Sequence, residues 1–93
     1  MLHSNNTGVH LSIDETALSN GELYTIVTNK AANGKKGALV AMVKGTKAEE
    51  VIEVLRKIPK RLRDKVREVT LDMAANMNRI VTRCFVKADK VID

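Results

Sequence analysis

Hydrophobic and polar residues alternate near the start of the chain, from Val9 to Ile13, with the period of a strand that buries one face. Asn20-Gly21 is a strong turn signal, and a run rich in β-branched residues follows from Glu22 to Thr28. A second turn, Asn33 to Gly37, precedes the apolar run Ala38 to Val43. The pattern predicts three strands joined by short turns, an antiparallel meander.

After Gly45 the apolar residues recur with a helical period. Thr46 and Glu49 have the spacing of a capping box, so we expect a helix from about Thr46 to Ile58 that ends at Pro59. A short helix or turn is expected between residues 60 and 67, because Leu62 and Val66 lie one turn apart.

The strand and helix patterns then repeat. Val69 to Leu71 is a predicted fourth strand, the stripe Met73 to Cys84 predicts a helix from about Ala74, and Val91-Ile92 begins a fifth strand. Helices that cross between the last strands make those strands parallel. The predicted fold is an α/β mixed sheet in the order βββαβαβ, with strand order 3-2-1-4-5.

Composition limits the chain to one small domain. It has 93 residues, 44% hydrophobic but only 2% aromatic, so aliphatic side chains must form the core. We expect residues 1–8 to be a disordered or tag-like leader and residues 9–93 to be the folded part of the chain. The last residues read as a strand that has just begun, which predicts that the chain is cut from a longer protein.

Charge and cysteine content add little about partners. The net charge of +5 slightly favours an anionic partner, but 11 acidic residues are interspersed. The lone Cys84 cannot form a disulfide within the chain, which favours a reducing compartment. The sequence shows neither an apolar run long enough to span a membrane nor the apolar core of a signal peptide. We therefore expect a cytoplasmic protein without membrane contact.

Two aspartates, Asp14 and Asp72, stand at the ends of predicted strands. If the first and fourth strands are neighbours, both carboxylates lie close together and offer the oxygen ligands that Mg²⁺ prefers. Each residue also has an ordinary role available, Asp72 as a helix N-cap and Asp14 as a solvated strand-end residue. The basic residues from Lys57 to Arg67 could contact phosphates, although a solvated face is the preferred interpretation.

Four segments resemble the catalytic region of bacterial insertion-sequence DDE transposases of the ISL-three family. They are Leu11-Ser12-Ile13-Asp14-Glu15-Thr16-Ala17-Leu18, Gly21-Glu22-Leu23-Tyr24-Thr25-Ile26-Val27-Thr28, Val69-Thr70-Leu71-Asp72-Met73 and Ala88-Asp89-Lys90-Val91-Ile92-Asp93. The resemblance implies that residues 9–93 are a partial ribonuclease H-like catalytic core in which Asp14 and Asp72 are catalytic acids that bind Mg²⁺, with Mn²⁺ as a substitute. Asp93 looks like the start of a further motif, and the family's third acid, a glutamate, lies on a later helix.

The implied reaction of the parent protein is phosphodiester hydrolysis at transposon ends, followed by strand transfer into target DNA. The isolated fragment is expected to be inactive, and the parent protein could form a homo-oligomer. Two alternatives remain open: a nuclease on the same fold, such as a junction resolvase, and a non-catalytic module that binds nucleic acid or protein.

Overall fold

A five-stranded mixed sheet organises the chain. The computed structural model describes residues 1–18, 20–32, 37–71 and 75–92, except for the side chains of Ala75 and Asn76. The strand order is β3-β2-β1-β4-β5, as predicted, and it is consistent with a ribonuclease H-like fold. β1 pairs antiparallel with β2 and parallel with β4. The strands are β1 (His10–Ala17), β2 (Leu23–Asn29), β3 (Leu39–Lys44), β4 (Glu68–Leu71) and β5 (Asp89–Ile92).

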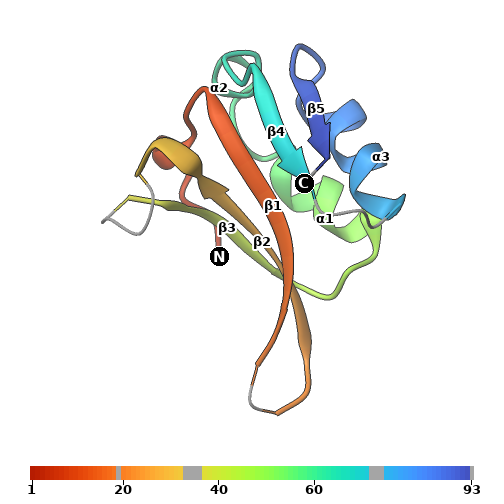
Figure 1. Cartoon of the computed structure of the whole chain (residues 1–93). Coiled ribbons are helices and arrows are strands. Elements are labelled where there is room, and N and C mark those ends of the chain that lie inside the picture. The colour runs from red at the N-terminus through yellow and green to blue at the C-terminus, as the bar shows by residue number, and fades with distance from the viewer. Residues whose placement is uncertain (19, 33–36, 72–74, 93) are drawn as a thin grey trace.

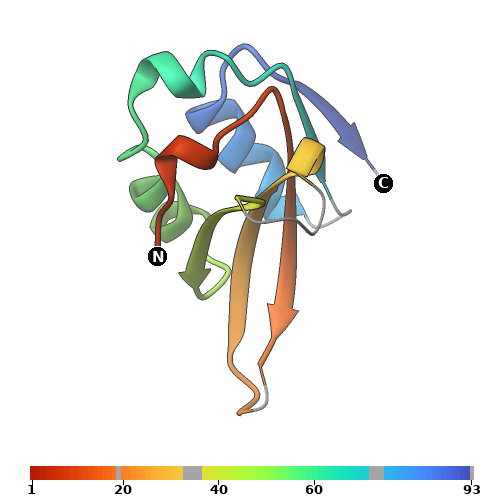
Figure 2. The same cartoon turned by 90° about the vertical axis from the view of Figure 1, so that its left-hand side faces the viewer.

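Two helices, α1 (Ala48–Leu55) and α3 (Ala75–Cys84), pack on one face of this sheet, and the short α2 (Lys60–Arg63) lies at its end (Figures 1 and 2). Two single 3₁₀ turns, η1 (Ser4–Asn6) and η2 (Lys30–Ala32), complete the described elements. None of the α-helices in the described part of the chain covers the opposite face, which we call the open face; there the 3₁₀ turn η2 lies beside β1 (Figure 2).

The first helix is shorter than its apolar pattern predicts. Its N-cap is Lys47, whose side chain makes no capping hydrogen bond, and not Thr46. Glu49, in the first turn of the helix, forms an ion pair with Arg79 of α3, with Oε1 and Nη2 2.8 Å apart. The helix ends at Leu55, and a turn brings Ile58 into the core, so the apolar spacing continues beyond the helix itself.

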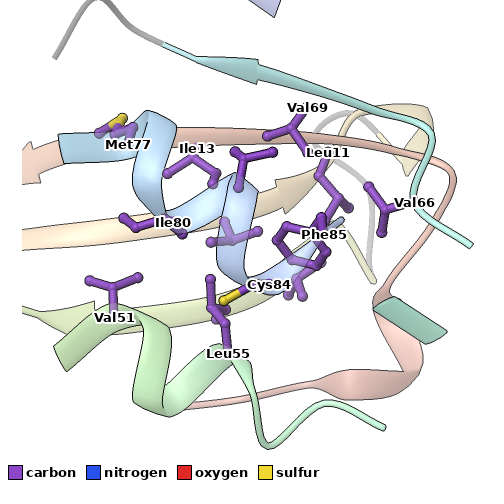
Figure 3. Close-up of a cluster of buried hydrophobic side chains, with 14 of the residues drawn as sticks. Leu11, Ile13, Val51, Leu55, Val66, Val69, Met77, Ile80, Cys84 and Phe85 are labelled. Atoms are coloured by element: carbon purple, nitrogen blue, oxygen red, sulfur yellow. The ribbon is translucent and has the colours of Figure 1, made fainter. Parts of the chain in front are cut away.

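The core lies between the sheet and these two helices (Figure 3). Leu11 and Ile13 of β1 are fully buried against residues of α1 and α3 such as Leu55 and Ile80. Phe85, which directly follows α3, is the largest buried side chain. The core is therefore almost entirely aliphatic, as the low aromatic content requires.

The first residues of the chain lie against β3. Leu2 forms an isolated bridge with Ala41, and the His3 amide donates to the Val40 carbonyl over 2.7 Å. The Asn6 side chain donates to the Leu39 carbonyl over 2.8 Å. The segment 1–8, which we expected to be a leader, thus borders the edge of the sheet.

Candidate acidic site on the open face

Asp14 lies on the open face of β1. Its neighbour Ile13 is fully buried against the helices, and successive strand residues point to opposite faces, so Asp14 points away from them and is exposed. Ser12 shares the open face, and its Oγ donates a hydrogen bond to Asp14 Oδ2 over 3.2 Å. The alternation of the sequence therefore predicts the orientation of this carboxylate.

β4 runs beside β1 in parallel, with Leu71 opposite Ile13. Leu71 is the last residue of β4, and Asp72 follows it in the sequence just as Asp14 follows Ile13. Asp72 itself lies outside the described residues, as does Asp93. The expected approach of the two carboxylates stays a prediction, and so does the N-cap role of Asp72.

A row of hydroxyl side chains crosses the open face beside Asp14. Ser12 pairs with Thr28 of β2 on one side and with Thr70 of β4 on the other. Cross-strand partners share a face, so the three hydroxyls line the same surface. This row places three hydroxyl groups side by side across the three central strands, and Ile26 of β2, the cross-strand partner of Asp14, is an apolar neighbour on the same face.

A cavity of about 530 Å³ opens over this row. Its lining residues come from β1, β2 and η2, and the start of β3 with the residue before it closes one side. The lining residues are Ser12, Asp14, Thr28, Asn29, Lys30, Ala38 and Leu39. The carboxylate of Asp14 and the ammonium of Lys30 therefore share one concave surface.

Lys30 reaches across β1 to β4. Its Nζ donates a hydrogen bond to Thr70 Oγ1 over 2.9 Å, although the two residues are 40 positions apart. Asn29 fixes the turn from which Lys30 projects, because its Oδ1 accepts a hydrogen bond from the Ala31 amide and its Nδ2 donates to the Asn6 carbonyl. Thr70 is only 8% exposed, so the anchor of the ammonium is itself well packed.

Sequence reasoning did not single out Lys30 or Thr70. No local spacing relates a lysine after one strand to a threonine in another strand 40 residues later. The register between β1 and β4 could have revealed Thr70. When these two strands pair in parallel with Ser12 opposite position 70, the polar residue between Val69 and Leu71 faces the same side of the sheet as Ser12.

Arg79 of α3 lies away from the cavity that contains Asp14. Its guanidinium pairs with Glu49 on α1, on the face of the sheet that the helices cover. A backbone hydrogen bond, and then the charge of Arg79, hold the pKa of Glu49 below its usual value. Arg79 therefore links two helices and does not line the cavity that contains Asp14.

The arrangement around Asp14 fits one ligand of a hard divalent cation. It offers an exposed carboxylate on a rigid strand, with a hydroxyl beside it and open space in front. Within the described ranges, no group of three His, Cys, Asp or Glu residues could hold a metal ion. A complete site thus needs further carboxylates from outside these ranges.

A comparison with protein-family models matches most of the chain. A family model described as "Transposase", for the ISL-three group of DDE enzymes, matches residues 11–93. No curated protein matches the chain.

The longest helix in the described part of the chain, α3, has 10 residues, and no helix there is long and apolar enough to cross a membrane.

Proposed function

Because the chain belongs to the ISL-three family of DDE transposases, we propose that Asp14 and Asp72 are two of the acids that bind Mg²⁺ for DNA cleavage and strand transfer in the parent protein. The family model matches 83 of the 93 residues, from Leu11 in β1 to Asp93. It supports a transposase-related domain that acts on DNA.

The observation that carries this proposal is the parallel pairing of β1 and β4 at the centre of the sheet. Ile13 lies opposite Leu71, and an aspartate follows each of them in the sequence. Adjacent parallel strands bring residues at equivalent positions to within one strand spacing, roughly 5 Å between backbones. Two carboxylates placed in this way could share divalent cations.

The residues around Asp14 fit such a cation. Ser12 orients the carboxylate by donating to Oδ2, which leaves the other oxygen, Oδ1, for a metal ion. When bound, Mg²⁺ would activate the attacking oxygen and stabilise the leaving oxygen of a phosphodiester. The parent protein would supply the third acid, the glutamate that the family carries on a later helix.

Lys30 has a separate part in this proposal. Its ammonium lies in the same cavity as Asp14 and offsets part of the carboxylate charge when no metal is bound. The same positive charge attracts a phosphate group of the DNA to the open face of the sheet. Thr70 holds the ammonium to one side, above β4, so that it does not form an ion pair with Asp14.

The test uses a protein extended through the downstream glutamate and the DNA-binding domain, with a duplex that carries the terminal repeats of its own element. Strand cleavage and joining are measured in Mg²⁺ and in Mn²⁺. We expect Asp14→Asn and Asp72→Asn each to abolish both reactions. Glu15→Gln is the matched control, because Glu15 is the adjacent acid but points to the other face of β1.

Metal-dependent cleavage that survives both aspartate substitutions would refute the assignment. Cleavage that depends on both acids but is never followed by joining would instead indicate a nuclease on the same fold. The 93-residue chain alone should neither cleave nor join DNA, because two acids hold Mg²⁺ too loosely to fix the geometry of phosphoryl transfer.

A further inference from the structure

Positive charge is concentrated in one short segment of the chain. Residues 56–67 contain seven of the 16 Lys and Arg residues but only one of the 11 Asp and Glu residues, a net charge of +6. The remaining 81 residues therefore carry a net charge of −1. The basic character of the whole protein comes from this segment, which includes α2.

The segment and a distant loop form one surface, which we call the basic pole. It consists of the exposed side chains Arg56, Lys57, Lys60, Arg61, Lys65, Arg67 and Lys87. α2 and the loop before β5 lie at the same end of the molecule (Figure 1). The positive charge of this end acts on Asp64: a hydrogen bond from Lys60, together with the charges of Lys60, Lys87 and Arg63, lowers the pKa of that carboxyl.

The basic pole is held rigidly to the core. Ile58 and Val66, on either side of α2, are fully buried. Arg63 fastens the segment to the end of α3, because its Nε donates to the Ile58 carbonyl over 2.9 Å and its Nη1 to the Cys84 carbonyl over 3.4 Å. A packed scaffold thus sets the backbone positions from which the exposed cations project.

Most of these cations have no acidic partner in the described part of the chain. Lys60 forms an ion pair with Asp64 over 2.7 Å. Among the residues that the structure describes, the other six members of the basic pole form no ion pair. Mutual repulsion of six unpaired cations favours a partner with closely spaced negative charges.

We propose that the basic pole binds the phosphate backbone of duplex DNA without reading its sequence. Duplex DNA presents one negative charge for about every 1.7 Å of its axis, a density that suits a cluster of cations. Residues 56–67 contain no aromatic side chain, and Phe85 is buried, so the surface offers no platform on which single-stranded bases could stack.

This surface is distinct from the site around Asp14. Arg67 directly precedes β4, whereas Leu71 ends it, so the two sites lie at opposite ends of the parallel strands, separated by about 10 to 13 Å along the sheet. The binding proposed here requires no metal ion. It therefore holds or fails independently of the catalytic roles of Asp14 and Asp72.

The experiment measures binding of the 93-residue chain to a labelled duplex of arbitrary sequence by fluorescence anisotropy, in EDTA and over a range of KCl concentrations. The variant carries Lys57→Gln, Arg61→Gln and Lys65→Gln. A control with the same loss of charge carries Lys44→Gln, Lys47→Gln and Lys90→Gln, all outside the basic pole. Thermal melting checks that both variants are folded.

We expect the pole variant to bind at least about tenfold more weakly in low salt, with the slope of log K against log [KCl] reduced by about two to three. The control should lose much less affinity. Asp64→Asn removes the one acid of the segment and should tighten binding, a gain that misfolding cannot produce.

Equal losses in the two triple variants would overturn the proposal, because net charge alone would then explain binding. Absence of duplex binding by the unmodified chain in low salt would also overturn it. Tighter binding to single strands, to RNA or to vesicles that contain phosphatidylserine would assign the basic pole to a different partner and contradict the proposal.

Discussion

Substituting Lys30 by Gln should tighten metal binding at Asp14. The Lys30 ammonium is fixed 2.9 Å from Thr70 Oγ1, and Thr70 pairs with Ser12, two residues before Asp14. Two residues along a strand span roughly 7 Å, which sets the scale of the distance between the ammonium and a cation bound by Asp14. Their repulsion opposes metal binding.

The magnitude follows from Coulomb's law. A single charge and a divalent ion about 7 Å apart in water repel each other by about 1 kcal/mol. At 0.1 M ionic strength, where the Debye length is about 10 Å, screening removes roughly half of this energy. We therefore expect Lys30→Gln to lower the Kd for Mn²⁺ about threefold at 0.1 M salt and about fivefold at 0.01 M salt.

The assay follows the line broadening that Mn²⁺ causes in the amide signals of Ile13 and Glu15. Lys90→Gln is a close control: Lys90 Nζ also donates to a threonine hydroxyl, that of Thr82, over 2.7 Å, but on the helix-covered side of the sheet. Its Kd should be unchanged. An unaltered Kd in Lys30→Gln, or equal changes in both variants, would refute the placement of Lys30 beside the metal site.

Three further predictions concern the scaffold. Leu55→Ala should lower the free energy of unfolding in urea by about 2–5 kcal/mol because Leu55 is fully buried, whereas Val86→Ala, at a side chain 63% exposed, should change it by less than about 0.5 kcal/mol. Gly45→Ala should cost about 1 kcal/mol in the same assay, since Gly45 has φ of +94° and its amide bonds to the Leu23 carbonyl; an unchanged stability would contradict this. Burial raises the pKa of the Cys84 thiol from 9.0 to about 11, so the folded state disfavours the thiolate. The contribution of this thiol to the free energy of unfolding should be full below pH 9 and be lost as the pH rises toward 11. At pH 8 the thiol of the folded chain should react with disulfide reagents far more slowly than the thiol of the chain unfolded in urea. Rapid labelling of the folded chain would contradict this prediction.

Much of the fold could be predicted because the apolar periods are local. The strand that begins near Val9 and the helix that ends at Cys84 were located from alternation and helical spacing alone. The length of β1 was underestimated, since its second half, through Ala17, is held by pairing with β2 and is largely exposed. Tertiary pairing extends this strand beyond its hydrophobic pattern.

The candidate site was predictable only in part, because some of its contacts depend on tertiary pairing. The face of Asp14 follows from its position next to the buried Ile13, which the sequence pattern contains. The contact between Lys30 and Thr70 depends on a turn that Asn29 fixes and on the register of β1 with β4. Both are non-local, so no window of sequence reveals them.

A Mg²⁺ titration of the chain, followed by amide chemical shifts, tests the central claim most directly. The account predicts that millimolar Mg²⁺ shifts the amides next to Asp14 and Asp72 first, and that Asp14→Asn or Asp72→Asn abolishes the shifts at both positions. Shifts centred on His3, His10 or Asp89, or no shifts at all, would contradict a metal site shared by Asp14, within β1, and Asp72, which follows β4 in the sequence.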